Sequence, residues 1–388
     1  MLSDPIPLCV PEMSGGEWGY IRECLDTNWV SYVGPFVERF ENSIAAITGA
    51  EHAVAMNSGT AALHTALAIS GVKSGDEVIM PAVTFVAPGN AVRYQGAWPS
   101  FVDIDLETWQ MDVDKLAWFL SALCEKRTEG LYNIATGRRI AALMPVHLLG
   151  GMFDVDAIAS LAFEYDLPLI EDAAECLGAK YRGRGIGAEV PSIPGCRRIV
   201  CTSFNGNKIV TTGGGGALLT NDLDSAMQAK HLSTTAKADP IEFFHDAVGY
   251  NYRLTNIAAA MGVAQLEVLY RYVDRKRAIA DRYSGAFQGI ADIITHPEPP
   301  DTTCTYWMYT VLLNRRARPV VDALLAEGIG SRPIWRPLNV LPAFENCFSG
   351  DLTATELVCE RAISLPCSVG LSESEQSRVI DVVKGVLF

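Results

Sequence analysis

One lysine, Lys208, stands in a setting that suits amine chemistry. It ends the run Ser203-Phe204-Asn205-Gly206-Asn207-Lys208 and is followed closely by four glycines, Gly213 to Gly216. Apolar residues at 198–201 and 217–220 predict a buried strand on each side of this run. A lysine on a loop between buried strands loses solvation, which favours the neutral amine needed for Schiff-base formation. The alternative is an ordinary solvated lysine, since most lysines lie at the surface.

Two further groups of polar residues could bind a charged ligand. Ser58-Gly59-Thr60 opens a predicted helix, where free amides and the helix dipole favour an anion. An ordinary helix cap by Ser58 or Thr60 is the alternative. Asp172 ends a predicted buried strand beside Glu171. A carboxylate there could cap a helix, form an ion pair, or hold a protonated pyridine nitrogen.

The elements that must position these residues alternate between short apolar runs and amphipathic stretches from residue 52 onward. This alternation predicts a mostly parallel sheet covered by helices on both faces. Ligands in such sheets bind at the carboxyl ends of the strands, where the polar residues fall. The predicted strands are 52–56, 77–80, 100–103, 140–147, 168–172, 198–201 and 217–222. The predicted helices are 36–48, 61–70, 85–94, 112–124 and 154–165.

The last third of the chain predicts a second, smaller α/β unit. A long helical region is expected over about 256–287, followed by a strand at 309–313 and a helix at 319–327. We therefore expect a large domain at 13–264 and a small domain at 265–388 that also includes residues 1–12.

Composition and charge exclude several classes of protein. The chain has 388 residues, with 31 basic and 45 acidic side chains and a net charge of −14, which disfavours a nucleic-acid binder. No apolar run is long enough to span a membrane, and the N-terminus lacks the pattern of a secretory signal. The ten cysteines form no Cys-x-x-Cys pair, and the six histidines show no ligand spacing. We expect a cytoplasmic protein with reduced thiols and no metal site.

Several motifs together resemble those of one family, the DegT/DnrJ/EryC1/StrS sugar aminotransferases, over essentially the whole chain. The family uses pyridoxal phosphate (PLP) and has the aspartate aminotransferase (type I) fold. The motifs that carry the resemblance are Asn28-Trp29-Val30-Ser31 with Gly34-Pro35, Asn57-Ser58-Gly59-Thr60, Gly75-Asp76-Glu77 with Thr84-Phe85, Pro145-Val146-His147-Leu148, Glu171-Asp172-Ala173-Ala174-Glu175, Ser203 to Lys208, and Gly249-Tyr250-Asn251-Tyr252-Arg253.

The resemblance implies a role for each matching residue. Lys208 matches the Schiff-base lysine, and Asp172 matches the partner of the pyridine nitrogen. Glu175 falls near the ring oxygen, where many members carry Gln. The remaining implied contacts are a phosphate cradle of Ser58, Gly59, Thr60 and Ser203, the ring-packing Phe85, and an Asn251 that reaches the phosphate from the other subunit. Candidate sugar-nucleotide contacts are Tyr32, Arg253, Trp335 and Arg336, for which aromatic core packing and ion pairing are the alternatives.

The resemblance also implies a reaction and an assembly. It predicts a homodimer with active sites at the subunit interface that moves an amino group from L-glutamate to the 4-keto group of a nucleotide-linked 4-keto-6-deoxy sugar. A 3-keto sugar or a keto-cyclitol remains an alternative acceptor, and a non-catalytic regulatory protein an alternative class. The chain departs from the family at Asn339, where a histidine is expected, and at 185–198, which is longer than usual.

Overall fold

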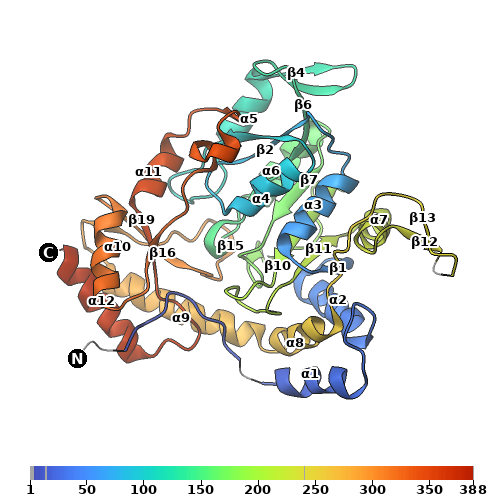
Figure 1. The fold of residues 1–388 in the computed structure, drawn as a ribbon. Coiled ribbons are helices and arrows are strands. Elements are labelled where there is room, and N and C mark those ends of the chain that lie inside the picture. Colours follow the sequence, from blue (N-terminus) through green and yellow to red (C-terminus); the bar gives the residue numbers. More distant parts are fainter. Residues whose placement is uncertain (1–3, 14, 240, 388) are drawn as a thin grey trace.

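The centre of the molecule is a large, mostly parallel β-sheet, seen in a computed structural model that describes residues 4–13, 15–239 and 241–387 (Figure 1). Pairing is parallel from β10 through β7, β6, β2 and β3 to β18, and antiparallel where β11 joins β10 and β1. In spatial order, the strands are β1 (His52–Met56), β11 (Gly216–Thr220), β10 (Arg198–Ser203), β7 (Leu169–Asp172), β6 (Arg139–Leu143), β2 (Glu77–Pro81), β3 (Trp98–Val102) and β18 (Phe348–Ser349). A hairpin of β4 (Cys124–Arg127) and β5 (Gly130–Asn133) extends β6.

Side chains alternate along the buried strands and so build two apolar cores, one on each face of the sheet. Ile170, Ile199 and Leu218 contribute to the core that includes α3. Leu169 and Val200 belong to the other core. The sequence prediction of a sheet covered on both faces is therefore confirmed.

The helices follow the predicted alternation. The helical region expected over 256–287 is present as two helices, α8 and α9, which meet at Val268 with φ −114° and ψ 4°. The helices are α1 (Glu17–Asp26), α2 (Pro35–Thr48), α3 (Gly59–Ile69), α4 (Val86–Tyr94), α5 (Val113–Ala122), α6 (Val155–Glu164), α7 (Leu223–Ser233), α8 (Asn256–Leu266), α9 (Leu269–Phe287), α10 (Ala317–Ala326), α11 (Thr353–Arg361) and α12 (Glu373–Leu387).

A second, antiparallel sheet is formed by the last third of the chain. Its order is β14 (Ile293–Ile294), β16 (Tyr309–Leu313), β19 (Ala362–Leu365) and β17 (Arg332–Pro333). Smaller pairings join β15 (Thr302–Thr303) to β8 (Lys180–Tyr181) and β9 (Arg184–Gly185), and join β12 (Lys237–Asp239) to β13 (Phe244–His245). The expected domain boundary at residues 264 and 265 stays a prediction, and residues 1–3, 14, 240 and 388 within those ranges lie outside the described part of the chain.

Two findings bear on the environment of the protein. Within the described residues, no helix combines the length and the apolar character that a bilayer crossing requires. All ten cysteines are free thiols.

Candidate active site

A cavity of about 280 Å³ opens where β7 and β10 end and α3 begins. This is the edge of the sheet at which the sequence predicted a ligand site. Nine of the predicted site residues line the cavity: Ser58, Gly59, Thr60, Phe85, Asp172, Glu175, Ser203, Lys208 and Trp335. Residues from five separate segments therefore meet in one place.

Lys208 lies on a turn held by backbone hydrogen bonds between β10 and β11. Its own N–H donates to the Asn205 carbonyl at 3.0 Å. Phe204 donates to Gly215 at 2.8 Å and accepts from Thr212 at 3.0 Å. The side chain of Lys208 is only 12% exposed, so the amine sits inside the protein. The prediction of a lysine on a loop between two buried strands is confirmed.

The first turn of α3 faces the same cavity and has the features of an anion site. Ser58 caps the helix, because its Oγ accepts the N–H of Ala61 at 3.0 Å. The chain passes so close here that a Cβ on Gly59 would lie 2.9 Å from the Cβ of Ser203, and one on Gly216 would overlap the Ser58 backbone. Glycine at both positions lets β10, β11 and the start of α3 come together around the cavity.

Asp172 presents a buried carboxylate to the cavity. Its Oδ1 accepts the N–H of Ala174 at 2.9 Å, and among the described residues its Oδ2 has no hydrogen-bond donor. Burial raises the pKa of Asp172, while the Ala174 amide and the charge of Lys208 oppose that rise. An oxygen without a donor in a buried site is available to a ligand that carries an N–H.

The preceding carboxylate, Glu171, is fully paired on the other side of β7. Arg198 donates to both of its oxygens, with Nη2 at 2.8 Å from Oε2, and His147 Nε2 lies 2.9 Å from Oε2. Burial alone would raise the pKa of Glu171, but Arg198 and His147 outweigh it and lower the pKa to about 2. Glu171 is thus a structural anion.

Glu175 lies beside the lysine. Its Oε2 accepts the N–H of Leu149 at 2.8 Å, and its Oε1 lies 3.6 Å from Lys208 Nζ. Burial raises the pKa of Glu175 to about 7, against the lowering effect of Lys208. The family resemblance implies that Glu175 lies near the ring oxygen of the cofactor, where a carboxylate would need a proton or a nearby cation. The raised pKa of Glu175 favours the proton, and Lys208 is the nearby cation.

Among the lining residues that the sequence analysis did not name are Trp307 and Arg332. Trp307 precedes β16, and Arg332 begins β17, so both come from the second sheet. The sequence offered little indication of a site role for Trp307, because an aromatic residue just before a predicted strand is usually part of the core. Trp307 is indeed 2% exposed, yet its ring faces Lys208.

Four predicted site residues lie away from this cavity within one chain. Arg253 is buried and donates to Glu41 at 2.8 Å and to the Ala55 carbonyl at 3.0 Å, so its guanidinium already has two partners. Tyr32, Asn251 and Arg336 are exposed. Their roles toward a ligand stay predictions.

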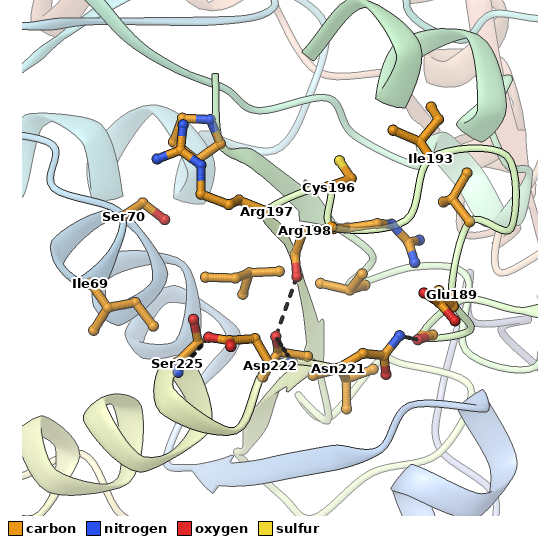
Figure 2. Close-up of a pocket in the computed structure, with 18 residues that line it drawn as sticks. Ile69, Ser70, Glu189, Ile193, Cys196, Arg197, Arg198, Asn221, Asp222 and Ser225 are labelled. Atoms are coloured by element: carbon orange, nitrogen blue, oxygen red, sulfur yellow. Dashed lines mark hydrogen bonds between the residues drawn. The ribbon is translucent and has the colours of Figure 1, made fainter. Parts of the chain in front are cut away.

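A larger cavity, of about 460 Å³, lies at the opposite edge of the same strands (Figure 2). It is lined by the starts of β7 and β10, the end of β11, and the long segment at 187–198. Its charged groups are mostly partnered: Arg198 also donates to Ile186 and Ala188 carbonyls, and Asp222 caps α7. The cavity at the carboxyl ends is smaller but holds the reactive groups.

Comparison with known proteins gives concordant results. Residues 11–384 match the model of the DegT/DnrJ/EryC1/StrS aminotransferase family. A "GDP-perosamine synthase" from Caulobacter vibrioides is 37% identical and covers 98% of both chains, and a "putative pyridoxal phosphate-dependent aminotransferase EpsN" from Bacillus subtilis is 38% identical and covers 97% of this chain and 95% of that one. The crystal structure of the aminotransferase TlmJ from Streptoalloteichus hindustanus superposes with a TM-score of 0.88, at 28% identity over 98% of both chains.

Proposed function

The chain belongs to the DegT/DnrJ/EryC1/StrS aminotransferase family, and on that premise we propose that it moves an amino group from L-glutamate to the 4-keto group of a nucleotide-linked 4-keto-6-deoxy sugar. The observation that carries this proposal is the joint presence of Lys208 and Asp172 in one buried cavity beside the first turn of α3. An amine, a carboxylate and an anion site are the three groups that a pyridoxal phosphate enzyme needs.

The donor set of the cavity fits pyridoxal phosphate. Lys208 would hold the cofactor covalently through Nζ, and Asp172 would hold the ring nitrogen through Oδ2. Ser58, Gly59, Thr60 and Ser203 would hold the phosphate, since all four line the cavity where α3 begins and the first turn of a helix offers free amides. Phe85 lines the cavity with half of its surface exposed, which leaves its ring available to pack on the cofactor.

Each of these residues contributes a definite chemical step. The bound cofactor supplies a ring that takes up the electron pair released at the substrate carbon. Lys208 Nζ, once free, would take the proton from the α-carbon of the amino donor and give it up to the other carbon bonded to the donor's nitrogen. Asp172 keeps its partner nitrogen protonated, because a buried carboxylate favours a charged hydrogen-bond donor. Glu175, with a pKa of about 7, can share a proton with Lys208 at neutral pH.

The proposed acceptor rests on the relatives and on the pocket. A relative at 37% identity is named for a GDP-linked product, which supports a nucleotide sugar as the substrate class. Trp335 and Arg332 stand at the cavity and could contact the sugar or its diphosphate. The cation of Arg332 suits a diphosphate, and the ring of Trp335 suits the apolar face of a sugar.

We also propose a homodimer with shared active sites. Apolar side chains with large exposed surfaces gather in two projecting parts, α1 with the loop that follows it, and the region of the β12–β13 hairpin (Figure 1). They include Trp18, Leu25, Trp29, Ile241, Phe243, Phe244 and Val248. Asn251 follows the hairpin and is exposed, as a residue that completes the partner's site would be.

A spectroscopic assay tests the proposal. Protein loaded with pyridoxal phosphate should absorb visible light, and excess L-glutamate should remove that absorbance. A panel of keto-sugar nucleotides then identifies the acceptor by mass spectrometry of an aminated product, and it includes 3-keto sugars and keto-cyclitols. Turnover by Lys208→Ala would refute the assignment of the lysine. In the same assay, Asn251→Ala and Lys208→Ala chains that regain activity on mixing would support shared sites.

A further inference from the structure

The Lys208 amine lies on the face of an aromatic ring. Its Nζ is 3.9 Å from the centroid of the Trp307 indole. Trp307 is 2% exposed and stacks on Trp335, with ring centroids 6.2 Å apart and an angle of 10° between the planes. An ammonium group over an indole face is attracted by the quadrupole of the ring, and the attraction is strongest where water is excluded.

Trp307 also holds the backbone of the lysine turn. Its indole Nε1–H donates to the carbonyl of Asn207 at 2.7 Å, and Asn207 directly precedes Lys208. One side chain therefore contacts both the head of the lysine and the chain that carries it. The two contacts use different parts of the indole, so substitutions can separate them.

The backbone around Trp307 is itself fixed. Thr305 donates to the Gly150 carbonyl at 2.9 Å, and the carbonyl of Trp307 accepts from Cys367 Sγ at 3.5 Å. Tyr306 has φ +48°, a strained value for a residue with a Cβ, which turns the chain just before β16. The backbone at Trp307 is thus held by Gly150 and by Cys367, both outside the loop that contains Lys208.

Other charged groups face Lys208 from different elements. Glu175 lies 3.6 Å from its Nζ, and the charge of Lys208 also acts on Asp172 at the end of β7. Arg332 at the start of β17 adds a positive charge to the same cavity. Within the described part of the chain, Glu175 and Trp307 are in direct contact with the amine, and Trp307 contacts it through an uncharged surface.

We propose that Trp307 is a positioning residue that holds the Lys208 ammonium group on the indole face whenever the freed amine has taken up a proton. This inference rests on the proposed function, which alternately binds and frees the amine. The indole face gives the freed, protonated lysine one resting place within the cavity. Because the attraction acts only on the charged form, it weakens as the lysine loses its proton.

The test measures how fast acetic anhydride labels Lys208 in the full-length, cofactor-free protein, by mass spectrometry, relative to the exposed Lys230. Trp307→Leu removes the ring face, whereas Trp307→Phe keeps a ring face and loses only the N–H donor. We expect Trp307→Leu to label about five- to tenfold faster than the natural protein at pH 7. Trp307→Phe should stay within about twofold, and the excess in Trp307→Leu should shrink between pH 7 and pH 10.

Controls separate this inference from other effects. Phe85→Leu removes another ring from the same cavity without touching the amine, and its Lys208 should label as in the natural protein. Equal labelling of Trp307→Leu and the natural protein would overturn the inference. So would an excess that is constant with pH, which a purely steric opening would give, or a Trp307→Phe rate equal to that of Trp307→Leu.

A second arm keeps the proposed function separate. Loading the natural protein with pyridoxal phosphate should protect Lys208 from the reagent, and excess L-glutamate should restore its labelling. If loading gives no protection, the proposed function fails while the cofactor-free comparison still tests Trp307. If protection occurs but the variants label alike, the inference on Trp307 fails and the proposed function stands.

Discussion

The two ends of β7 and β10 carry cavities of opposite character. The cavity at the amino ends is larger, about 460 Å³ against 280 Å³, yet Arg198 at its edge is bound by Glu171 and by two backbone carbonyls. At the carboxyl ends, one oxygen of Asp172 has no hydrogen-bond donor among the described residues, and Glu175 accepts from one amide and lies beside a lysine. A reaction site is therefore recognised by buried charged groups that can still accept or donate hydrogen bonds. The volume of a cavity does not distinguish such a site.

This contrast predicts that changes at the carboxyl end alter chemistry, whereas changes in the Glu171–Arg198 pair alter stability. The largest effect is expected for Lys208→Ala. Its turnover number should fall at least about 1000-fold, because the group that transfers the proton is lost. The free energy of unfolding should fall by only about 1–2 kcal/mol, because the amine loses its contacts with Glu175 and with the Trp307 ring. Steady-state kinetics and urea unfolding measure both quantities, and Lys230→Ala is the control on an exposed lysine.

Asp172→Asn should give the next largest effect. The amide keeps the shape and can still accept the Ala174 N–H, but it loses the charge that faces the cavity. Loss of one charge-assisted hydrogen bond, about 3 kcal/mol, lowers kcat/KM about 100-fold. Kinetics with saturating pyridoxal phosphate measure this change. A variant with natural kcat/KM would show that the carboxylate has no part in the chemistry.

Arg198→Met should lower stability and leave activity nearly unchanged, the opposite of Lys208→Ala. It leaves Glu171 buried without its cation, which should cost about 3–5 kcal/mol in the free energy of unfolding. Activity per folded molecule at low temperature should stay close to that of the natural protein. The neighbouring Arg197 pairs on the surface with Asp166, so Arg197→Met should cost less than about 1 kcal/mol. Equal losses in the two variants would remove the distinction between the two cavities.

Glu175→Gln should show the smallest effect, as a change in pH dependence. The folded protein keeps the Glu175 proton up to about pH 7, whereas the unfolded chain releases it near pH 4.5. The stability of the cofactor-free natural protein should therefore decline as the pH rises through this window, by on the order of 2–3 kcal/mol. Glu175→Gln should lack that part of the decline. Thermal unfolding from pH 4.5 to pH 8 compares the two, and parallel curves would contradict the raised pKa.

Much of the fold follows from local sequence. Apolar runs predict β1 and β16 with their observed bounds, and the glycine-rich run after Lys208 predicts a turn between two strands, which is where β10 and β11 place it. The predicted strand at 140–147 is longer than β6, which ends at Leu143. The apolar character of the run continues, but only an isolated pairing of Val146 with Asp172 follows the strand.

The parts of the site that escaped prediction depend on contacts distant in sequence. Trp307 lies 100 residues beyond Asn207, to which its N–H donates, and nothing near Trp307 in the sequence indicates a lysine partner. The strand β18 likewise is only two residues long, too short to show an alternation of apolar and polar residues. It is a strand because it pairs with β3 at the edge of the large sheet. Motifs identify groups that react, whereas the groups that position them emerge only when the sheets are assembled.

The parallel pairing of β3 with β18 has a consequence for synthesis of the protein. Nearly 250 residues separate the two strands, which bring the segment after β17 against the large sheet. Trp307 and Arg332 also come late in the chain. While still on the ribosome, a growing polypeptide can fold the segments that contain Lys208 and the start of α3. The cavity remains incomplete at that stage, because Trp307 and Arg332 have not yet been added. Capture of the cofactor in its final surroundings must wait until translation is almost finished.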